Sequence, residues 1–515
     1  MLLSSLLSFL TDPNIRHLGE NLPISGVTCD SREVKPGFIF VAIPGALTDG
    51  HLYIESAIEK GASAIVAEKD VEIDIGGISY VTVPFARQAL AELSRAYFGF
   101  ADRDMYMIGI TATNGKTTTT SMLRHILEAE KVPTSVIGSV AYSFGDEKTA
   151  SVLTTPESSE LHAMLKKQRE AGIKVVSMEV SSIAEEQCRV YGIRYDAVAF
   201  LNITPDHLPD HGSFEAYYEA KAMLVKNVAE GVPVILNLDD PRVAQLQDET
   251  KGQVIGIGID HGTALISAEN LTMPGGIPQF DLVIRSPLRT GRGELPPGRW
   301  PVKLSIPGRH TVYNAMAALT IAMAYGIAPE RAVKLIESFP GIERRLQILY
   351  QKEFTIIDDH ISDEDNTRKM MEALVQMTEG APVKIIYAIR GNRGVEVNRE
   401  VIGQFQAFRD KINWSTFYLT SSRDLAKPRD VVRDEEYDTV TSDLEHAGYN
   451  FTYIPNLADA IEQMLPTVLP GEFFVLAGSH NMDKGARIAL NLLAEGREAS
   501  ERESILKVLE DRMMG

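Results

Sequence analysis

Apolar residues occur along this chain in two patterns, short continuous runs and helical spacing, which predict alternating strands and helices. Apolar runs at 105–110, 174–180, 197–203 and 233–238 have the length of buried strands, and stretches with helical spacing stand between them. Such alternation is typical of a mostly parallel sheet that helices cover on both faces. The predicted fold class is therefore α/β.

The same rhythm divides the chain into three predicted segments. Residues 1–103 contain short strands and helices, and residues 104–338 contain the longer run of strands and amphipathic helices. Pro340-Gly341 marks the next boundary, and residues 339–515 repeat the strand and helix order of a smaller, Rossmann-like domain. A length of 515 residues also favours about three domains.

Composition and charge narrow the class of protein. A net charge of -19 argues against a nucleic-acid polymer as partner, since such binding needs a basic patch. No run approaches the ~18 apolar residues of a membrane span, so we expect no membrane partner. Cys29 and Cys188 have neither zinc-site nor disulfide-framework spacing. A reducing cytoplasm fits this cysteine usage best.

A loop with glycine, lysine and threonines follows the apolar run 105–110. Its sequence is Thr111-Ala112-Thr113-Asn114-Gly115-Lys116-Thr117-Thr118, and it opens a helix predicted over 117–130. In such an order, loop amides and the helix N-terminus face the phosphates of a nucleoside triphosphate, the lysine reaches the outer ones and a hydroxyl holds Mg²⁺. The strict pattern has a glycine where this chain has Ile110, so an ordinary strand-to-helix turn is the alternative.

Much of the chain around this loop resembles the Mur ligase family, and its MurE branch in particular. The matching motifs are Cys29-Asp30-Ser31-Arg32, Asp49-Gly50-His51, Thr154-Thr155-Pro156-Glu157, Glu179-Val180-Ser181-Ser182, Leu201 to Leu208, Asp210-His211-Gly212 and Lys221 in an A-K-x-x-L context. The resemblance implies an N-terminal domain that binds a uridine nucleotide, a central P-loop ATPase-like domain and a C-terminal domain that binds the incoming amino acid.

The resemblance also implies the catalytic residues. Lys116 would contact ATP, and Thr117, Glu179 and His207 would hold Mg²⁺. Lys221 would be carbamylated by CO2, which turns a cation into a carboxylate that stabilises the metal. Lys221 shares the apolar stripe of the helix predicted over 213–228, so a lysine that snorkels from the edge of that stripe is the alternative.

The remaining site residues are implied in the same way. The residues implied for the nucleotide are Thr113, Asn114, Gly115, Lys116, Thr117, Thr118, Asn314, Arg345 and Asp359, with Arg344 as the alternative to Arg345. The residues implied for the substrate are Ser31, Thr154, Thr155, Ser182, Arg189 and His211. Pro209 and Ile183 depart from the family pattern nearby.

The C-terminal segment departs most from the family. The DNPR motif that binds diaminopimelate is replaced around Ser421-Ser422-Arg423-Asp424, and the GKGHE motif is replaced by Gly478-Ser479-His480-Asn481. These losses argue against meso-diaminopimelate as the amino acid. We expect Asp424 to pair with a side-chain ammonium, and Arg390 or Arg393 to bind the α-carboxylate by bidentate pairing.

The function predicted is that of an ATP-dependent, ADP-forming ligase. A carboxylate of a UDP-linked precursor, in the first instance UDP-MurNAc-L-Ala-D-Glu, would form an acyl phosphate that a free amino acid attacks, with His360 or His211 as base. One alternative is a divergent Mur ligase acting on a pseudomurein-type UDP-peptide, a polyglutamate or a specialised metabolite. Another is a nucleotide-binding sensor or scaffold without ligase activity. We expect a cytoplasmic monomer or weak oligomer.

Overall fold

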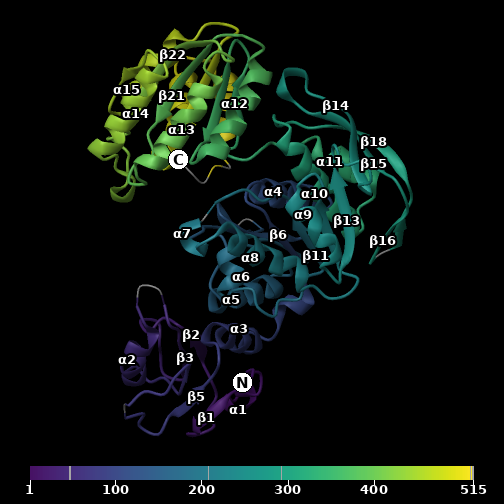
Figure 1. Cartoon of the computed structure of the whole chain (residues 1–515), viewed down its shortest axis with the longest axis vertical. Helices are drawn as coiled ribbons and strands as arrows, with labels where there is room; N and C mark the ends of the chain where they lie inside the picture. The colour runs from purple at the N-terminus through teal and green to yellow at the C-terminus, as the bar shows by residue number, and fades with distance from the viewer. Residues whose placement is uncertain are drawn as a thin grey trace. The chain divides into compact units, whose positions relative to one another are not determined.

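The computed structural model describes residues 1–45, 48–72, 74–145, 147–206, 208–291, 293–510 and 512 (Figure 1). The chain forms two compact units. Unit 1 comprises Met1–Ile266, Arg285–Pro297 and Ala317–Ala328, and unit 2 comprises Ser267–Ile284, Gly298–Met316 and Pro329–Gly515. Both units combine helices with mostly parallel strands, which confirms the α/β fold class.

The first sheet of unit 1 has five strands in the spatial order β1-β5-β4-β3-β2. Its elements are α1 (Leu3–Leu7), β1 (Asn14–His17), β2 (Gly26–Thr28), β3 (Phe38–Ala42), η1 (Gly50–Tyr53), α2 (Ile54–Glu59), β4 (Ala64–Ala67), β5 (Ser79–Thr82), α3 (Ala86–Tyr97) and η2 (Ala101–Asp104). Strand β3 is apolar throughout because α1 and α3 cover one face and α2 covers the other. All pairs are parallel except β1 with β5.

The second sheet carries most of the sequence motifs. Within unit 1 its strands follow the order β13-β12-β11-β6-β10-β7-β8-β9, with parallel pairing from β13 to β7 and antiparallel pairing beyond. The strands are β6 (Tyr106–Thr111), β7 (Thr134–Ile137), β8 (Ala141–Phe144), β9 (Glu147–Ala150), β10 (Val175–Glu179), β11 (Ala197–Phe200), β12 (Pro233–Asn237) and β13 (Gln253–Gly258). The hairpin β16 (Leu288–Thr290) and β17 (Gly293–Leu295) also belongs to unit 1.

Helices cover this sheet, and three of its strands end at the same edge. They are α4 (Lys116–Ala129), α5 (Ser158–Glu170), α6 (Ser182–Glu186), α7 (Leu208–His211), α8 (Phe214–Lys226), α9 (Pro241–Gln245) and η3 (Leu246–Asp248). Strand β6 lies between β10 and β11, in a register that aligns Glu179 with Ile110 and Phe200 with Thr111. The segments that follow these three strands therefore begin at one edge, which is where open α/β sheets bind ligands.

Unit 2 is built around a six-stranded sheet in the order β19-β20-β24-β21-β22-β23, in which only β19 is antiparallel to its neighbour. Its strands are β19 (Gln347–Gln351), β20 (Thr355–His360), β21 (Val383–Ala388), β22 (Trp414–Thr420), β23 (Thr452–Tyr453) and β24 (Phe473–Gly478). Its helices are α11 (Pro329–Ile336), α12 (Glu364–Thr378), α13 (Val395–Phe408), η5 (Pro428–Asp430), α14 (Asp434–His446), α15 (Leu457–Met464), η6 (Leu465–Thr467), η7 (His480–Met482), α16 (Gly485–Ala494), α17 (Ala499–Leu506) and η8 (Lys507–Leu509).

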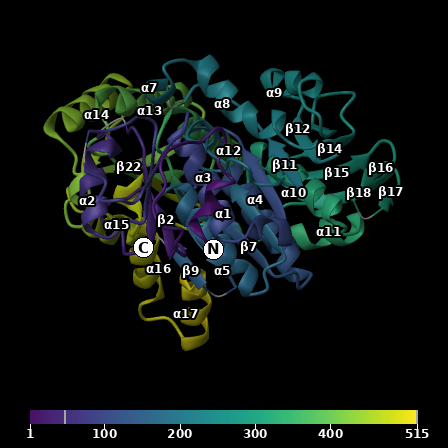
Figure 2. The ribbon, with the colours of Figure 1, turned by 90° about the horizontal axis from the view of Figure 1, so that it is seen from below.

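The remaining elements are β14 (Ile266–Thr272), η4 (Pro274–Gly276), β15 (Gln279–Ile284), β18 (Gly298–Lys303) and α10 (His310–Tyr325). Strand β15 pairs with β18 in antiparallel register. Helices α16 and α17 pack against each other, as the yellow ribbon in Figure 2 shows.

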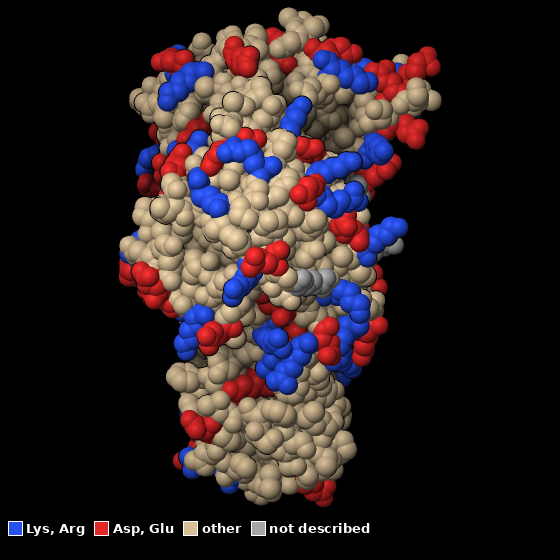
Figure 3. Space-filling model, turned by 90° about the vertical axis from the view of Figure 1, so that its right-hand side faces the viewer, with Lys and Arg blue, Asp and Glu red and all other residues tan. Residues whose placement is uncertain are grey.

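Acidic and basic side chains are interspersed on the face in Figure 3.

Two sequence predictions can be compared with these elements directly. The helix predicted over 117–130 is α4, one residue earlier at each end, and the predicted strands correspond to β6, β10, β11 and β12. No helix in the described part of the chain is long and apolar enough to cross a membrane. The boundaries at 103 and 338 stay predictions.

Candidate active site

The loop between β6 and α4 is held by Asn202, which follows β11. Asn202 Oδ1 accepts from the Asn114 amide at 3.0 Å, and Asn202 Nδ2 donates to the Asn114 carbonyl at 2.7 Å. Gly115, directly before α4, has a φ of +98°, a left-handed conformation that favours glycine. The loop is therefore preorganised around its glycine, with the α4 N-terminus open toward an anion.

Two lysines converge on one carbonyl oxygen of this loop. Lys116 Nζ donates to Ala112 O at 2.8 Å and to Thr113 O at 3.1 Å, and Lys221 Nζ from α8 donates to Ala112 O at 2.9 Å. Lys116 is half-buried, whereas Lys221 is 2% exposed. Two ammonium groups on one neutral acceptor repel each other, so the arrangement favours loss of a proton or arrival of an anion.

Lys221 is the group on which that repulsion acts most strongly. Its Nζ lies 4.7 Å from the centroid of the Tyr217 ring. Burial lowers the pKa of Lys221 well below its usual value, the charge of Lys116 lowers it further, and Asp206 acts in the opposite sense. The structure thus places a lysine that readily becomes a neutral, nucleophilic amine next to the phosphate-type loop.

Glu179, the last residue of β10, is 1% exposed and is held by the turn after β7. Its two carboxylate oxygens accept from the Ser139 amide at 3.1 Å and the Ser139 hydroxyl at 3.0 Å. A Cβ at Gly138 would lie 2.2 Å from Glu179 Oε1, so the carboxylate needs glycine there. Thr154 continues the network, because its hydroxyl lies 3.0 Å from Ser139 Oγ.

The residues expected to bind substrate form two groups around α6. Thr155 and Arg189 are one group: Thr155 Oγ1 donates to Glu179 O at 2.9 Å, and Arg189 Nη1 donates to Thr155 O at 3.0 Å. Ser182 and His211 are the other, with His211 Nε2 2.9 Å from Ser182 Oγ and Nδ1 3.0 Å from Glu186 Oε2.

The other expected residues of unit 1 vary in how far the structure defines them. The carbonyl of Ser31 accepts from Lys60 Nζ at 2.7 Å. Thr117 and Thr118 are half-buried in the first turn of α4. His207 lies outside the described residues. Within the described ranges, no group of three or more His, Cys, Asp or Glu side chains could hold a metal ion.

In unit 2, the expected nucleotide residues lie on or before β20. Asp359 is 6% exposed and accepts from the Leu346 amide at 2.8 Å, and burial raises its pKa to about 6. Arg344 is 1% exposed and donates to Asp358 and to the Ser479 carbonyl, whereas Arg345 is exposed and donates to Asn366 at 3.3 Å. Asn314 is 3% exposed in α10. Of the two arginines, Arg345 is thus the one open to a ligand.

Asp424 and Arg390, two of the residues expected to bind the amino acid, have other partners. Both Asp424 carboxylate oxygens accept backbone amides at the start of α15, from Leu457 at 2.9 Å and Ala458 at 3.2 Å. Arg390 donates to the Ser362 carbonyl. Asp424 is therefore a helix cap, and its expected pairing with a ligand ammonium finds no support in its contacts.

Sequence reasoning missed three residues that shape the unit 1 site. Asn202 and Ser139 act through hydrogen bonds to residues 88 and 40 positions away, and Gly138 acts through the space that it leaves for Glu179, so no local spacing indicates these roles. The signal for Gly138-Ser139 was a small-residue pair after a buried strand. His360, a candidate base, is half-buried, and desolvation and the charge of Arg344 lower its pKa well below the usual value, which keeps the ring neutral.

Comparison with known proteins shows which family this chain is similar to. The Mur ligase middle domain family matches residues 110–322, and the catalytic domain of the Mur ligase family matches residues 23–98. A protein of Chlorobaculum tepidum named UDP-N-acetylmuramoyl-L-alanyl-D-glutamate–2,6-diaminopimelate ligase is 31% identical over 89% of this chain and 88% of that protein. A Listeria monocytogenes serotype 4b protein of the same name is 29% identical over 90% and 91%.

Solved structures are similar in fold. A structure titled with the same ligase name aligns with a TM-score of 0.68 at 22% identity, covering 93% of each chain. A UDP-N-acetylmuramoylalanyl-D-glutamyl-2,6-diaminopimelate–D-alanyl-D-alanyl ligase from Acinetobacter baumannii aligns with a TM-score of 0.60 at 19% identity, covering 92% of this chain and 93% of that one.

Proposed function

The chain belongs to the Mur ligase family and is an ATP-dependent ligase, and from this premise we propose that it adds an amino acid to UDP-MurNAc-L-Ala-D-Glu in peptidoglycan biosynthesis. The two relatives described above carry that acceptor in their names, and they align with this chain over nearly its whole length. Segments 1–103, 104–338 and 339–515 would serve the uridine nucleotide, ATP and the amino acid. A cytoplasmic location and a monomeric or weakly oligomeric state are part of the same proposal.

The observation that carries the proposal is the convergence of Lys116 and Lys221 on Ala112 O. In this reaction the γ-phosphoryl group of ATP passes to a carboxylate, so negative charge must be neutralised at the loop. Loop amides and the α4 N-terminus would hold the phosphates, and Lys116 would leave Ala112 O to contact them. Asn314, Arg345 and Asp359 are also proposed to contact the nucleotide.

Lys221 would be carbamylated. Its neutral amine attacks CO2, a new N–C bond forms, and the product loses one proton to give a carbamate anion. That change replaces a buried amine, whose protonated form repels Lys116, with an anion that attracts Lys116.

The oxygen donors around the loop fit Mg²⁺. The carbamate of Lys221, Glu179 and the Thr117 hydroxyl, with His207, would hold the ion, because hard cations prefer oxygen ligands and Mg²⁺ accepts few protein ones. Glu179 keeps lone pairs for this purpose, since each of its oxygens accepts one bond from Ser139. The bound ion would neutralise the charge that develops on the phosphates.

The chain's own residues would then order two steps. A substrate carboxylate attacks the γ-phosphorus and ADP leaves, which forms an acyl phosphate; the amine attacks its carbonyl carbon and phosphate leaves with the bond electrons. Ser31, Thr154, Thr155, Ser182, Arg189 and His211 are proposed to hold the UDP-linked substrate. His360 or His211 is proposed to accept the amine proton.

The test is mass spectrometry of UDP-MurNAc-L-Ala-D-Glu incubated with the protein, ATP, Mg²⁺, bicarbonate and single amino acids. A mass gain equal to one residue, together with ADP release, would support the proposal and name the amino acid. If no amino acid extends this acceptor although ATP binds, the acceptor assignment is wrong, and other UDP-linked or free peptides become the acceptors to test.

A further inference from the structure

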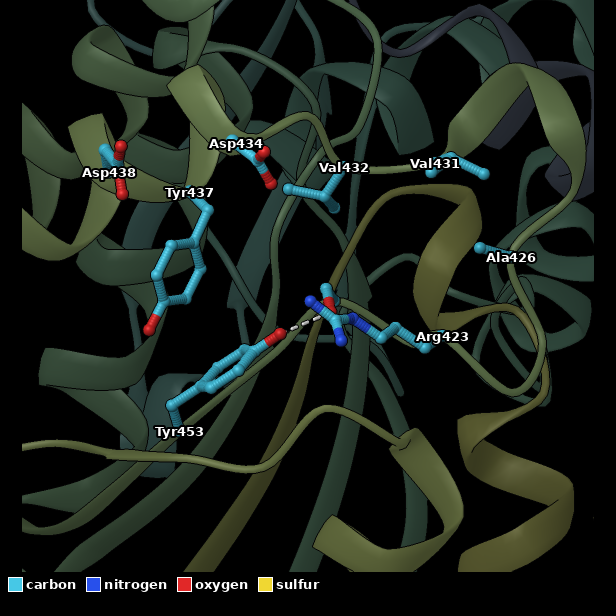
Figure 4. Close-up of a pocket in the computed structure, with 9 residues that line it drawn as sticks. Arg423, Ala426, Val431, Val432, Asp434, Tyr437, Asp438 and Tyr453 are labelled. Carbon is cyan, nitrogen blue, oxygen red and sulfur yellow. Dashed lines mark hydrogen bonds between the residues drawn. The ribbon is translucent and has the colours of Figure 1, made fainter.

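Unit 2 contains a cavity of about 750 Å³ at the carboxyl end of β22 and β23 (Figure 4). Arg423 enters it from the loop after β22, and Asp434 and Asp438 face it from α14. The rings of Tyr437 and Tyr453 meet edge to face, with centroids 4.7 Å apart. The volume is within the range of small-molecule sites, and aromatic walls with a few polar groups are typical of them.

The loop that carries Arg423 is fixed on both sides of it. The Arg423 amide donates to Pro455 O at 3.0 Å, and the Ser422 hydroxyl donates to Asn481 O at 2.5 Å. On the other side, Asp424 caps α15. The backbone of this loop is thus held by hydrogen bonds. The guanidinium of Arg423 extends into the cavity toward the Tyr453 hydroxyl, as Figure 4 shows.

The charged groups of this pocket are unpaired. The side chains of Arg423, Asp434 and Asp438 have no hydrogen-bond or ion-pair partner among the residues that the structure describes. By contrast, their neighbour Glu436 accepts four backbone amides, among them those of Asn392 and Arg393. The pocket therefore offers one cation and two anions to a ligand.

We propose that this pocket binds the incoming amino acid and selects a basic one with a single carboxylate, of the lysine or ornithine class, over diaminopimelate. This inference rests on the proposed function. The ligand carboxylate would pair with Arg423, which can donate two parallel hydrogen bonds. The side-chain ammonium would lie toward Asp434 and Asp438, with its carbon stem against Val432 and the tyrosine rings, which also attract a cation.

The charge count provides the selection. A lysine-type ligand has one carboxylate for the one arginine and a net positive charge for a pocket with one excess negative charge. Diaminopimelate has a second carboxylate, which this pocket would place near two aspartates without another cation. Like-charge juxtaposition of this kind is how binding sites reject a close analogue.

The first test is calorimetric titration of the full chain with L-lysine, L-ornithine, meso-diaminopimelate and L-alanine, with and without a nonhydrolysable ATP analogue. We expect lysine and ornithine to bind at least tenfold more tightly than the other two. Asp434→Asn should weaken lysine binding about tenfold while weakening diaminopimelate binding less, because it removes a repulsion. Arg423→Gln should weaken all four ligands.

Glu435→Gln is the matched control, because Glu435 is exposed on the same helix and does not line the pocket. It should bind lysine like the unmodified chain. The proposal is wrong if lysine fails to bind under both conditions, if diaminopimelate binds more tightly, or if Asp434→Asn changes all four affinities equally. A change in folding alone would not alter the ratio between lysine and diaminopimelate.

A second test separates the pocket from the reaction. If lysine binds as expected but no amino acid extends UDP-MurNAc-L-Ala-D-Glu, the pocket assignment stands and the proposed ligation fails. If diaminopimelate is ligated with a higher kcat/KM than lysine, the ligation stands and the pocket assignment is wrong.

Discussion

The loop site of unit 1 and the cavity of unit 2 differ in how their charged groups are held. In unit 1, Lys116, Lys221 and Glu179 each form hydrogen bonds to backbone or to a serine of the scaffold. In unit 2, the described charges of the cavity, Arg423 and Asp434 among them, extend from a fixed backbone without partners. Preorganised groups suit a phosphoryl transfer whose geometry never varies, and unpaired groups suit the choice of a ligand.

This difference explains where the family resemblance is strong. A substitution at Lys221 or Glu179 disturbs several bonded neighbours, so the residue types around the loop are tightly constrained. A substitution at Arg423 or Asp434 changes only what the cavity binds. The comparison predicts that variants of the loop site abolish turnover, whereas variants of the cavity redirect it.

The largest effect is expected for Lys221→Ala. Loss of the amine removes the group proposed to be carbamylated, so we expect the ligation rate to fall at least 10³-fold, with ATP binding retained. Added acetate or formate should restore part of the rate by supplying a carboxylate to the vacated space. ADP release and product mass, measured together, report the effect.

Lys226→Ala is the control for that change, since Lys226 ends the same helix and forms partly exposed ion pairs with Glu219 at 2.8 Å and Glu249 at 2.7 Å. It should keep the rate within about twofold, as surface ion pairs contribute little. Full ligase activity in Lys221→Ala would show that the loop site accepts substitutions as readily as the cavity does. The proposed difference between the two sites would then be wrong. No rescue by short carboxylates would argue against carbamylation.

The next effect is expected for Gly138→Ala. The new Cβ would lie 2.2 Å from Glu179 Oε1, so the carboxylate has to move away from Ser139. We expect the ligation rate to fall about 100-fold and the free energy of unfolding to fall by about 2 kcal/mol, as for other steric conflicts in a core. Gly262→Ala, where a Cβ would meet open space, should change neither. An unchanged rate in Gly138→Ala would show that Glu179 is not held as tightly as the comparison requires.

The sequence predicted the fold class, and the order of strand, loop and helix around the loop site, because the signals for both are local. The apolar run before the loop, the glycine at its end and the helical spacing after it all lie within 105–130. What it left open depends on distant partners: Arg344 and Arg345 are neighbours, and only the bonds of Arg344 to Asp358 and the turn after β24 make it part of the interior. Asp424 looked like a ligand residue because its partner, the amide of Leu457, lies 33 residues away.

A buried acid in unit 1 departs from the pattern of paired charges. Glu185 of α6 is 9% exposed, its carboxylate has no partner among the described residues, and burial raises its pKa to about 8. The folded state therefore binds the proton more tightly than the unfolded state, where the pKa is near 4.5. The contribution of Glu185 to the free energy of unfolding is therefore fully present below pH 4.5 and is lost as the pH rises through 8.

Glu185→Leu should remove that loss. We expect the variant to be more stable than the unmodified chain by about 2 to 3 kcal/mol at pH 9 and by much less at pH 5, from urea unfolding at both values. Glu170→Leu, at an exposed glutamate of α5, should show no such pH-dependent gain. An equal gain in the free energy of unfolding at both pH values would mean that the Glu185 carboxylate is paired or hydrated. Glu185 would then be no exception to the paired charges of unit 1.

The smallest effect is expected for Asp424→Ala, which tests the boundary between scaffold and cavity within one loop. Because Asp424 caps α15 through Leu457 and Ala458, its loss should lower the free energy of unfolding by about 1 kcal/mol. The KM for the amino acid should stay within about twofold, while Asp434→Asn raises it about tenfold. Asp424→Asn, which can still accept one of the amides, should restore part of the stability. If Asp424→Ala instead raised this KM as much as Asp434→Asn with no change in stability, the ligand would contact the residue that the sequence indicated, and the division into fixed and unpaired charges would not hold in this loop.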